Sequence, residues 1–269
     1  MAGASQNRTV FITGATSGIG RELARQFHQQ GANVFVTGRR VDKLEDLVKE
    51  LGPAGIQFLA ADVCQIAQLK SAVVRCVEVF GGIDIGIANA GFGVSGALSD
   101  LQIEDYRRQF ETNVFGVLNT VYALESELEK TKGQLVLMGS VAGFVPLPGN
   151  SAYTMSKFCI RALAGALQFE WKPKGISVTH LAPGFVDSDI RRVDNQGKIK
   201  EGHPDPIPSW IRVRTDLAAK EMLRAIQKRK NQRVITGHGK AIYLLNQYLV
   251  GLIPWIIGRL GLRSRPEPK

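Results

Sequence analysis

The chain of 269 residues is 44% hydrophobic and 22% charged, a balance typical of a globular protein with a substantial core. The first residues lack the apolar segment of a secretory signal. The three cysteines, Cys64, Cys76 and Cys159, are too scattered for a disulfide framework, so we expect reduced thiols and a cytoplasmic location. The four histidines are equally scattered, and no metal site is expected.

The net charge of +10 is distributed unevenly along the chain. Residues 1–190 contain 17 Lys and Arg against 18 Asp and Glu, a net charge of −1, whereas residues 191–269 contain 17 against 6, a net charge of +11. A basic segment of this kind can bind nucleic acid or an anionic membrane, or have no specific partner. Aromatic residues do not alternate with the basic ones as in nucleic-acid-binding motifs, so no nucleic-acid partner is predicted.

Segments typical of strands and helices alternate along most of the chain. In chain order the pattern predicts a strand over 8–15, a helix over 19–31, a strand over 32–39, a helix over 41–52, a strand over 56–63, a helix over 65–80, a strand over 83–91, a helical region over 104–130, a strand over 133–140, a helix over 151–172, a strand over 175–184, a helix over 215–230 and a strand over 232–237. This alternation predicts an α/β fold, a doubly wound parallel sheet flanked by helices. His180, in a predicted buried strand, is expected to be a hydrogen-bonded core residue.

The segment TGATSGIG (13–20) lies between the first predicted strand and the first predicted helix. There Gly14 would allow a tight turn, Gly18 would allow a phosphate to approach the backbone, and Gly20 would allow close helix packing. The N–H groups at the start of the helix could then bind a pyrophosphate. The spacing G-x-x-x-G-x-G differs from the more common G-x-G-x-x-G, but its strand-to-helix position favours a dinucleotide site.

The end of the second predicted strand, VTGRR (36–40), bears on which dinucleotide binds. An acidic residue there would bind a ribose 2′-hydroxyl, whereas a nearby arginine would accommodate a 2′-phosphate. Gly38 stands where the acid would be, and Arg39 and Arg40 follow. NADP(H) is therefore the predicted cofactor; the alternative is that both arginines are simply solvated.

A tyrosine and a lysine stand four residues apart in SAYTMSKF (151–158). In a helix Tyr153 and Lys157 would lie on one face. A neighbouring cation lowers the pKa of a phenol because it stabilises the phenolate. An isolated pair of this kind is more often an exposed tyrosine beside a solvated lysine, so its interpretation depends on the rest of the chain.

The chain resembles the short-chain dehydrogenase/reductases over about residues 8–237. Five segments occur in the order typical of that family, namely TGATSGIG at 13–20, ADV at 61–63, ANAG at 88–91, GSVAG at 139–143 and YTMSK at 153–157. The resemblance implies a Rossmann-like domain over 1–237, in which hydride passes between a nicotinamide cofactor and a carbonyl or alcohol group. It also implies a homo-oligomer, a dimer or tetramer, formed through the helices near 104–130 and 151–172.

The resemblance further implies roles for individual residues. Tyr153 matches the catalytic acid/base, and Lys157 matches the residue that lowers its pKa and binds the nicotinamide ribose. Ser140 matches the serine that orients the substrate oxygen, and Asn113 the asparagine that holds a water in the proton relay. The implied cofactor contacts, with Asp62 at the adenine and the Pro183–Gly184 turn beside the nicotinamide, are Gly14, Thr16, Ser17, Gly18, Ile19, Gly20, Arg39, Arg40, Asp62, Val63, Asn89, Ala90, Gly91, Tyr153, Lys157, Pro183, Gly184, Val186 and Ser188.

Two positions depart from the family's usual pattern. The segment ANAG replaces the usual NNAG, which loses one amide but keeps Asn89. Ser188 stands where a threonine usually follows the Pro-Gly pair, and it keeps a hydroxyl that can reach the carboxamide. Both changes are compatible with the predicted roles.

The predicted site suits carbonyl reduction. Hydride transfer to a ketone leaves negative charge on oxygen, and a tyrosine with an ordinary pKa of about 10 is poorly matched to protonate it at neutral pH. Lys157 and the oxidised nicotinamide both favour the phenolate, and Ser140 donates where charge develops. The leading hypothesis is an NADPH-dependent carbonyl reductase or alcohol dehydrogenase. The alternatives are an epimerase or dehydratase of the same fold, which usually has a longer C-terminal domain, and a non-catalytic NADP(H)-binding redox sensor.

The C-terminal extension, 238–269, contains AIYLLNQYLVGLIPWIIG (241–258), which has no charged residue. It is shorter than the about 20 apolar residues of a spanning helix and is interrupted by polar residues and Pro254. Trp255 and nearby tyrosines suit a headgroup interface. We therefore expect peripheral membrane association through 241–262. Packing on the enzyme or on a partner subunit, and a true span, remain alternatives.

Two further expectations concern the substrate. The polar stretch 188–214, with Pro204, Pro206 and Pro208, is predicted to be a loop or a pair of short helices that covers the site. A site beside a membrane would suit a hydrophobic substrate. Long-chain ketones, 3-ketosphinganine-like lipids, steroids and retinoid-like aldehydes are the candidate classes.

Overall fold

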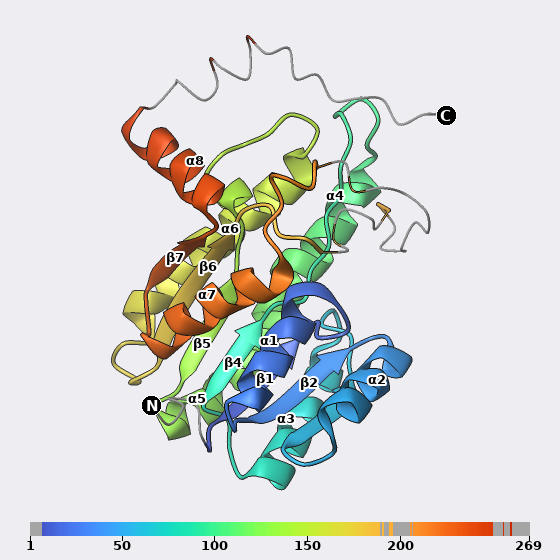
Figure 1. Cartoon of the computed structure of the whole chain (residues 1–269), viewed down its shortest axis with the longest axis vertical. Coiled ribbons are helices and arrows are strands. Elements are labelled where there is room, and N and C mark those ends of the chain that lie inside the picture. Colours follow the sequence, from blue (N-terminus) through green and yellow to red (C-terminus); the bar gives the residue numbers. More distant parts are fainter. Residues whose placement is uncertain are drawn as a thin grey trace.

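The computed structural model describes residues 7–188, 190, 194–195, 205, 207–249, 255 and 259. Within these residues one sheet contains seven parallel strands in the order β3-β2-β1-β4-β5-β6-β7, with helices on both faces (Figure 1). The predicted doubly wound parallel sheet is therefore confirmed. The strands are β1 (Thr9–Thr13), β2 (Asn33–Gly38), β3 (Ile56–Ala60), β4 (Ile85–Ala88), β5 (Gln134–Met138), β6 (Ser177–Pro183) and β7 (Gln232–Ile235).

The helices form two layers, one on each face of the sheet. One apolar core lies under α1, α2 and α7, and a second lies under α3, α5 and α6. The helical elements are α1 (Gly18–Gln29), α2 (Val41–Leu51), α3 (Ile66–Phe80), α4 (Ile103–Phe110), a π-helix η1 (Glu111–Phe115), α5 (Gly116–Thr131), a 3-10 turn η2 (Val141–Gly143), α6 (Ser151–Glu170), α7 (Thr215–Gln227) and α8 (Gly237–Tyr248).

Strand β1 shows why the sequence forms a sheet covered on both sides. All five of its residues are buried. Successive side chains of a strand point to opposite faces. Accordingly Val10 and Ile12 belong to one core, whereas Phe11 belongs to the other and stacks on Phe35 of β2 with a centroid separation of 5.6 Å. A strand that is apolar at nearly every position fits this two-sided burial.

The helical region predicted over 104–130 is not one uniform helix. It divides into α4, the π-helix Glu111–Phe115 and α5. Periodicity alone did not reveal the π-helix because a single wider turn of five residues is too short to show a period of its own. π-Helical turns often occur at functional sites, and this one contains Asn113.

The described part of the stretch 188–214 is tied to the body of the protein at two places. Val186 and Val213 form an isolated parallel bridge, and Arg212 forms ion pairs with Asp187 at 2.7 Å and Asp205 at 3.3 Å. Asn195 exchanges two hydrogen bonds with the backbone of Ser95, beyond β4. The remainder of the predicted substrate loop, including Pro204 and Pro206, lies outside the described residues.

The C-terminal extension begins as helix α8, directly after β7. Most of residues 250–269 lie outside the described part. Among the helices that are described, none is both long enough and apolar enough to cross a membrane.

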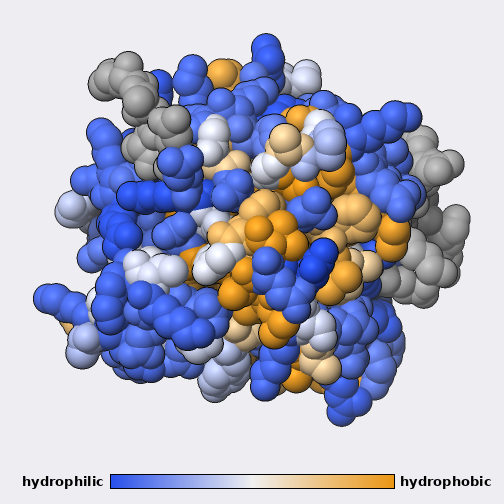
Figure 2. All heavy atoms as spheres, turned by 90° about the horizontal axis from the view of Figure 1, so that it is seen from below, coloured by the Kyte–Doolittle hydropathy of each residue, from blue (hydrophilic) through white to orange (hydrophobic). Residues whose placement is uncertain are grey.

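Figure 2 shows another surface feature, a face of the molecule on which hydrophobic side chains gather in a patch surrounded by hydrophilic ones.

Candidate active site

The site lies where the strand order reverses. The chain leaves β1 towards β2 on one side and β4 towards β5 on the other, and in sheets of this type ligands bind in the crevice beyond the carboxyl ends of such strands. The segments that follow β1, β4, β5 and β6 all leave the sheet at this edge. They carry the glycine-rich turn, residues 89–94, Ser140 and the Pro183–Gly184 turn.

The glycine-rich turn after β1 requires its glycines. Gly14 has a φ of +68°, and a Cβ there would lie 2.6 Å from Cα of Ala90, so the turn and the end of β4 touch backbone to backbone. Gly18 has a φ of +53°. Both conformations are costly for other residues. The turn therefore leaves its backbone accessible to a ligand at the N-terminus of α1, as a pyrophosphate site needs.

Asn89 holds this turn in place. Its side-chain amide donates to the carbonyl oxygens of Thr13 at 3.0 Å and Gly14 at 3.1 Å. A Cβ at Gly20 would collide with the same amide. Asn89 thus supports the predicted cofactor site by holding the glycine-rich turn in place.

Arg40, just after β2, reaches the same turn. Its guanidinium donates to Oγ1 of Thr16 at 2.8 Å and to Oγ of Ser17 at 3.0 Å. A Cβ at Gly38 would lie 2.6 Å from Cγ2 of Thr16, so an acidic residue would not fit at position 38 unless Thr16 moved. The donors present fit a phosphate group better than a hydroxyl pair. Arg39 is exposed beside them.

Asp62 and Val63 lie just beyond β3, next to the end of β2. The Asp62 carboxylate accepts from the backbone N–H of Cys64 at 3.0 Å, which fixes the turn. The amide of Asn119 on α5 donates to the carbonyl oxygen of Val63 at 2.9 Å. This arrangement places both predicted cofactor contacts at the same sheet edge as the glycine-rich turn.

Tyr153 and Lys157 lie on one face of α6, as their spacing predicts. Nζ of Lys157 is 5.7 Å from the centroid of the Tyr153 ring. The lysine is only 4% exposed, and its ammonium donates to the carbonyl oxygen of Met138, at the end of β5, at 2.9 Å. Burial lowers the pKa of Lys157 to about 8, which still leaves it mainly charged at neutral pH. The solvated-lysine alternative is therefore wrong.

Ser140 connects the ends of β5 and β6. Its hydroxyl accepts from the backbone N–H of Ala142 at 3.1 Å and points to the carbonyl oxygen of Pro183 at 3.5 Å. The second contact is long for a hydrogen bond and is easily exchanged for a better acceptor. The serine is thus positioned by η2 while its proton remains free to turn towards a substrate oxygen.

Asn113 lies inside the π-helix and is fully enclosed. Its amide nitrogen donates to the carbonyl oxygen of Phe92 at 2.9 Å and to Oγ of Ser156 at 3.3 Å, and its amide oxygen accepts from the N–H of Phe92 at 3.1 Å. Ser156 in turn donates to the carbonyl oxygen of Tyr153 at 2.7 Å. Asn113 therefore links the segment after β4 to the helix that carries Tyr153.

Two supporting residues were not found by sequence reasoning. Besides Ser156, Gln109 is fully buried and bonds the backbone N–H of Val94 at 2.6 Å and the carbonyl oxygen of Phe92 at 2.9 Å. Gln109 stands four residues before Asn113, so a polar i, i+4 pair on a helix face was the available signal. Ser156, beside Lys157, offered no comparable signal in the sequence.

His180 differs from its prediction in one respect. It is buried, as expected, and its ring fills the space left by the absent side chain of Gly139. Neither ring nitrogen makes a well-formed hydrogen bond among the described residues, where only a minor contact with the Gln232 side chain is present, so the expected hydrogen-bonded histidine is not observed. Burial, with the nearby charges of Lys157 and Arg161, lowers the pKa of His180 to about 4, which keeps the ring neutral.

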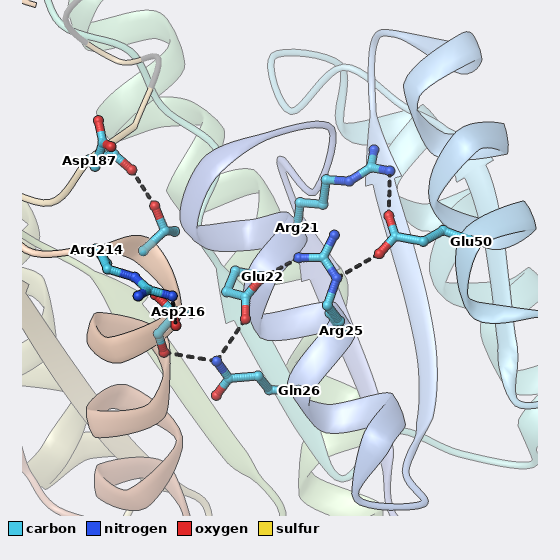
Figure 3. A network of polar contacts seen from close by, with 9 residues as sticks. Arg21, Glu22, Arg25, Gln26, Glu50, Asp187, Arg214 and Asp216 are labelled. Atoms are coloured by element: carbon cyan, nitrogen blue, oxygen red, sulfur yellow. Dashed lines mark hydrogen bonds and ion pairs between the residues drawn. The ribbon is translucent and has the colours of Figure 1, made fainter.

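A polar network connects the cofactor-side helix to the segment after β6 (Figure 3). On one side Arg21 and Arg25 of α1 hold Glu50 of α2 at 2.9 and 2.6 Å; the hydrogen bond from Arg25 is the main reason that the pKa of Glu50 falls to about 2. On the other side Gln26 donates to the backbone of Asp216 at 2.9 Å, at the start of α7. Thr215 then donates to the carbonyl oxygen of Asp187, which fixes the position of the neighbouring Ser188.

Comparison with known proteins agrees with this geometry. The sequence model of the short chain dehydrogenase family matches residues 8–199, which is well over half of the chain. The chain belongs to the short chain dehydrogenase family. The predicted family resemblance is therefore confirmed.

Two similar proteins match most of the chain. Dehydrogenase/reductase SDR family member 7B of Rattus norvegicus is 32% identical over 98% of this chain and 83% of its own length. An uncharacterized oxidoreductase of Staphylococcus aureus strain MRSA252 is 30% identical over 76% of this chain and 89% of its own.

A solved structure shows the same fold. The alcohol dehydrogenase of the archaeon Thermococcus sibiricus, in complex with 5-hydroxy-NADP, has a TM-score of 0.74 and 26% identity, and covers 84% of this chain and 95% of its own. Together the family match and the fold show an oxidoreductase of the class that acts on CH–OH and C=O groups with a nicotinamide cofactor.

Proposed function

We propose that this short chain dehydrogenase is an NADPH-dependent carbonyl reductase, or alcohol dehydrogenase in the reverse direction, that acts on a hydrophobic substrate. The observation that carries the proposal is the Tyr153–Lys157 pair, with a buried, mainly charged ammonium 5.7 Å from the phenol ring. Ser140 lies at the adjacent strand end, and Asn113 fixes the helix that carries the tyrosine through Ser156.

Reduction requires a hydride at the carbonyl carbon and a proton at the carbonyl oxygen. The nicotinamide cofactor, when bound, supplies the hydride. The Tyr153 hydroxyl gives its proton to the oxygen, and Ser140 donates a hydrogen bond to the same atom as negative charge develops there. Lys157 stabilises the phenolate that remains. We assign to Asn113 the binding of a water molecule through which Tyr153 regains its proton. The same steps in reverse oxidise an alcohol.

The choice of NADP(H) over NAD(H) rests on Arg40 and Gly38. The Arg40 guanidinium lies over the glycine-rich turn, and Gly38 lacks room for the acidic side chain that would bind a ribose 2′-hydroxyl. The Thermococcus enzyme with its 5-hydroxy-NADP supports the same choice. A substrate of hydrophobic character is supported by the exposed Leu98, Ile103 and Trp210, on the segments that follow β4 and β6. Long-chain ketones, 3-ketosphinganine-like lipids, steroids and retinoid-like aldehydes are the classes to test.

The test is NADPH oxidation with ketones and aldehydes graded by chain length and ring size. We expect turnover that increases with substrate hydrophobicity. Replacing Tyr153 by Phe should lower kcat at least about 100-fold, the contribution of a general acid, while the Kd of NADPH changes less than about threefold. Tyr122→Phe, at an exposed tyrosine of α5, is the matched control and should keep full activity.

The alternatives give different results. An undiminished kcat in Tyr153→Phe would remove the tyrosine from its proposed role. Tight NADPH binding without turnover on the whole panel would favour the redox sensor.

A further inference from the structure

Helix α8 is apolar on two faces. Its inner face, Ile242 and Tyr243, packs on Phe144, Val145 and Val234, and Tyr243 meets the Phe144 ring edge-on at 4.8 Å. Asn246 adds a hydrogen bond from its amide to the carbonyl oxygen of Phe144 at 3.0 Å. This face accounts for the docking of α8 on the protein.

The opposite face of α8 is also apolar, and nothing in the described part of the chain covers it. Leu244 is 50% exposed and Tyr248 is 77% exposed. A helix that is apolar on both sides is normally enclosed on both sides. This outer face, a shallow apolar hollow, consists of Ala241, Leu244, Leu245, Tyr248 and Leu249.

Charge indicates what covers the outer face. Lys240, which precedes it, is already paired with Glu221 at 2.6 Å, whereas Arg259 lies over the ring of Trp255 at 4.6 Å from the centroid. In the sequence Arg263, Arg265 and Lys269 follow, against one acidic residue, within a C-terminal region of net charge +11. An apolar helix face followed along the chain by cations and by an exposed tryptophan complements an anionic lipid surface, which offers both hydrocarbon and negative headgroups. A protein partner would have to provide acidic and apolar groups together.

We propose that the outer face of α8 binds the surface of an anionic lipid bilayer. The described part of α8 is too short to span the membrane, so the helix would lie in the interface with Leu244, Tyr248 and Leu249 inserted. The proposal goes beyond the enzymatic function and does not depend on it.

The start of α8 is fixed against the candidate active site. His238 accepts a hydrogen bond from the backbone N–H of Phe185 at 2.8 Å, and its ring stacks on that of Phe185. A Cβ at Gly184 would lie 2.5 Å from both His238 and Thr236. Thr236 has a φ of +80°, a strained conformation for a β-branched residue, and caps α8 through Gly239 at 3.2 Å. A bilayer bound to α8 would therefore lie at the sheet edge that carries the site.

The experiment is cosedimentation of the full chain, without cofactor or substrate, with phosphatidylglycerol vesicles and with phosphatidylcholine vesicles. We expect binding to the anionic vesicles, about tenfold or more weaker binding to the neutral ones, and release of the protein by high salt. In the double variant Leu244→Gln/Leu249→Gln the partition coefficient should fall at least about tenfold, because two large apolar side chains leave the interface. Leu217→Gln, on α7 and 54% exposed, is the matched control and should bind as the wild type does.

Every outcome decides the proposal. Loss of binding in the double variant but not in Leu217→Gln supports it. Absence of binding to both kinds of vesicle overturns it. If light scattering then shows that the double variant has a smaller molar mass than the wild type, the outer face is a contact between copies of this chain. Equal binding by the wild type and the double variant would also overturn it. None of these readouts uses catalysis, so failure of this proposal is distinguishable from failure of the proposed reductase.

Discussion

At the scale of single residues, Arg40 is the side chain on which the proposed preference for NADP(H) mainly rests. Its guanidinium is held by Thr16 and Ser17 at the glycine-rich turn, and these two hydrogen bonds orient it. A preoriented cation loses less side-chain entropy on binding a phosphate than a free one does. Arg39 beside it is exposed and has no such placement in the described contacts.

Replacing Arg40 by Leu should therefore weaken NADPH binding selectively. A hydrogen bond to a charged group contributes about 1.5–3 kcal/mol, so we expect the Kd of NADPH to rise about 10- to 100-fold. The Kd of NADH should change less than about threefold, because NADH lacks the 2′-phosphate. Fluorescence titration of both cofactors measures this, with Arg75→Leu on α3 as the control. An equal loss for NADPH and NADH would show that Arg40 only supports the turn.

The sequence was informative where chemistry needs a fixed spacing in one segment. Tyr153 and Lys157 are four residues apart on one helix, so their shared face could be predicted without the fold. The contacts of Asn113 and Ser156 could not, because they join residues 43 positions apart through a π-helix. Likewise the role of Asn89 depends on how closely β1 and β4 approach one another, which no local pattern records.

At the scale of elements, the fit between β5 and β6 depends on a pair of unequal residues. Gly139 follows β5, and the ring of His180 on β6 occupies the space that a side chain there would fill. The ring is buried and neutral, with the pKa of His180 lowered to about 4 mainly by burial. Because of this packing, His180 cannot easily accept a proton in the folded protein.

Acid should therefore destabilise the protein through His180. Between pH 6.5 and pH 4 the unfolded chain binds a proton at this residue and the folded protein does not, so the free energy of unfolding decreases as pH falls through this range. The full effect is about 3 kcal/mol. In His180→Leu the decrease should be smaller than in the wild type by about that amount. Urea denaturation from pH 4 to pH 7 measures the free energy of unfolding of the wild type and the variant. If His180→Leu keeps the pH dependence of the wild type, the effect is not due to His180.

The boundaries of elements were predicted less well than their order. Predicted strands extended past the sheet at their carboxyl ends, as in 133–140 against Gln134–Met138. The reason is physical. Gly139 and Ser140 turn away from the sheet to form part of the candidate site, so they no longer pair with the neighbouring strand. The sequence pattern cannot separate the last paired residue of a buried strand from the first residue of a tight turn.

At the scale of the whole molecule, several large apolar residues are exposed on the outer sides of α5 and α6. Phe115 at the end of the π-helix, Tyr122 on α5, and Met155, Phe158 and Phe169 on α6 are exposed. Large apolar side chains gathered on neighbouring surface helices are typical of subunit contacts. The family resemblance predicts an oligomer through these same two helical regions, so two independent considerations indicate the same surface.

We therefore expect a dimer or tetramer in solution. Charges placed in a buried apolar interface are strongly unfavourable, so the double variant Tyr122→Asp/Phe169→Asp should raise the subunit dissociation constant at least about 100-fold. Val74→Asp, at an exposed valine of α3, is the matched control and should leave the molar mass unchanged. Light scattering after size-exclusion chromatography, over a range of protein concentrations, measures all three proteins. A wild-type monomer, or a double variant that associates as the wild type does, would exclude α5 and α6 as the interface.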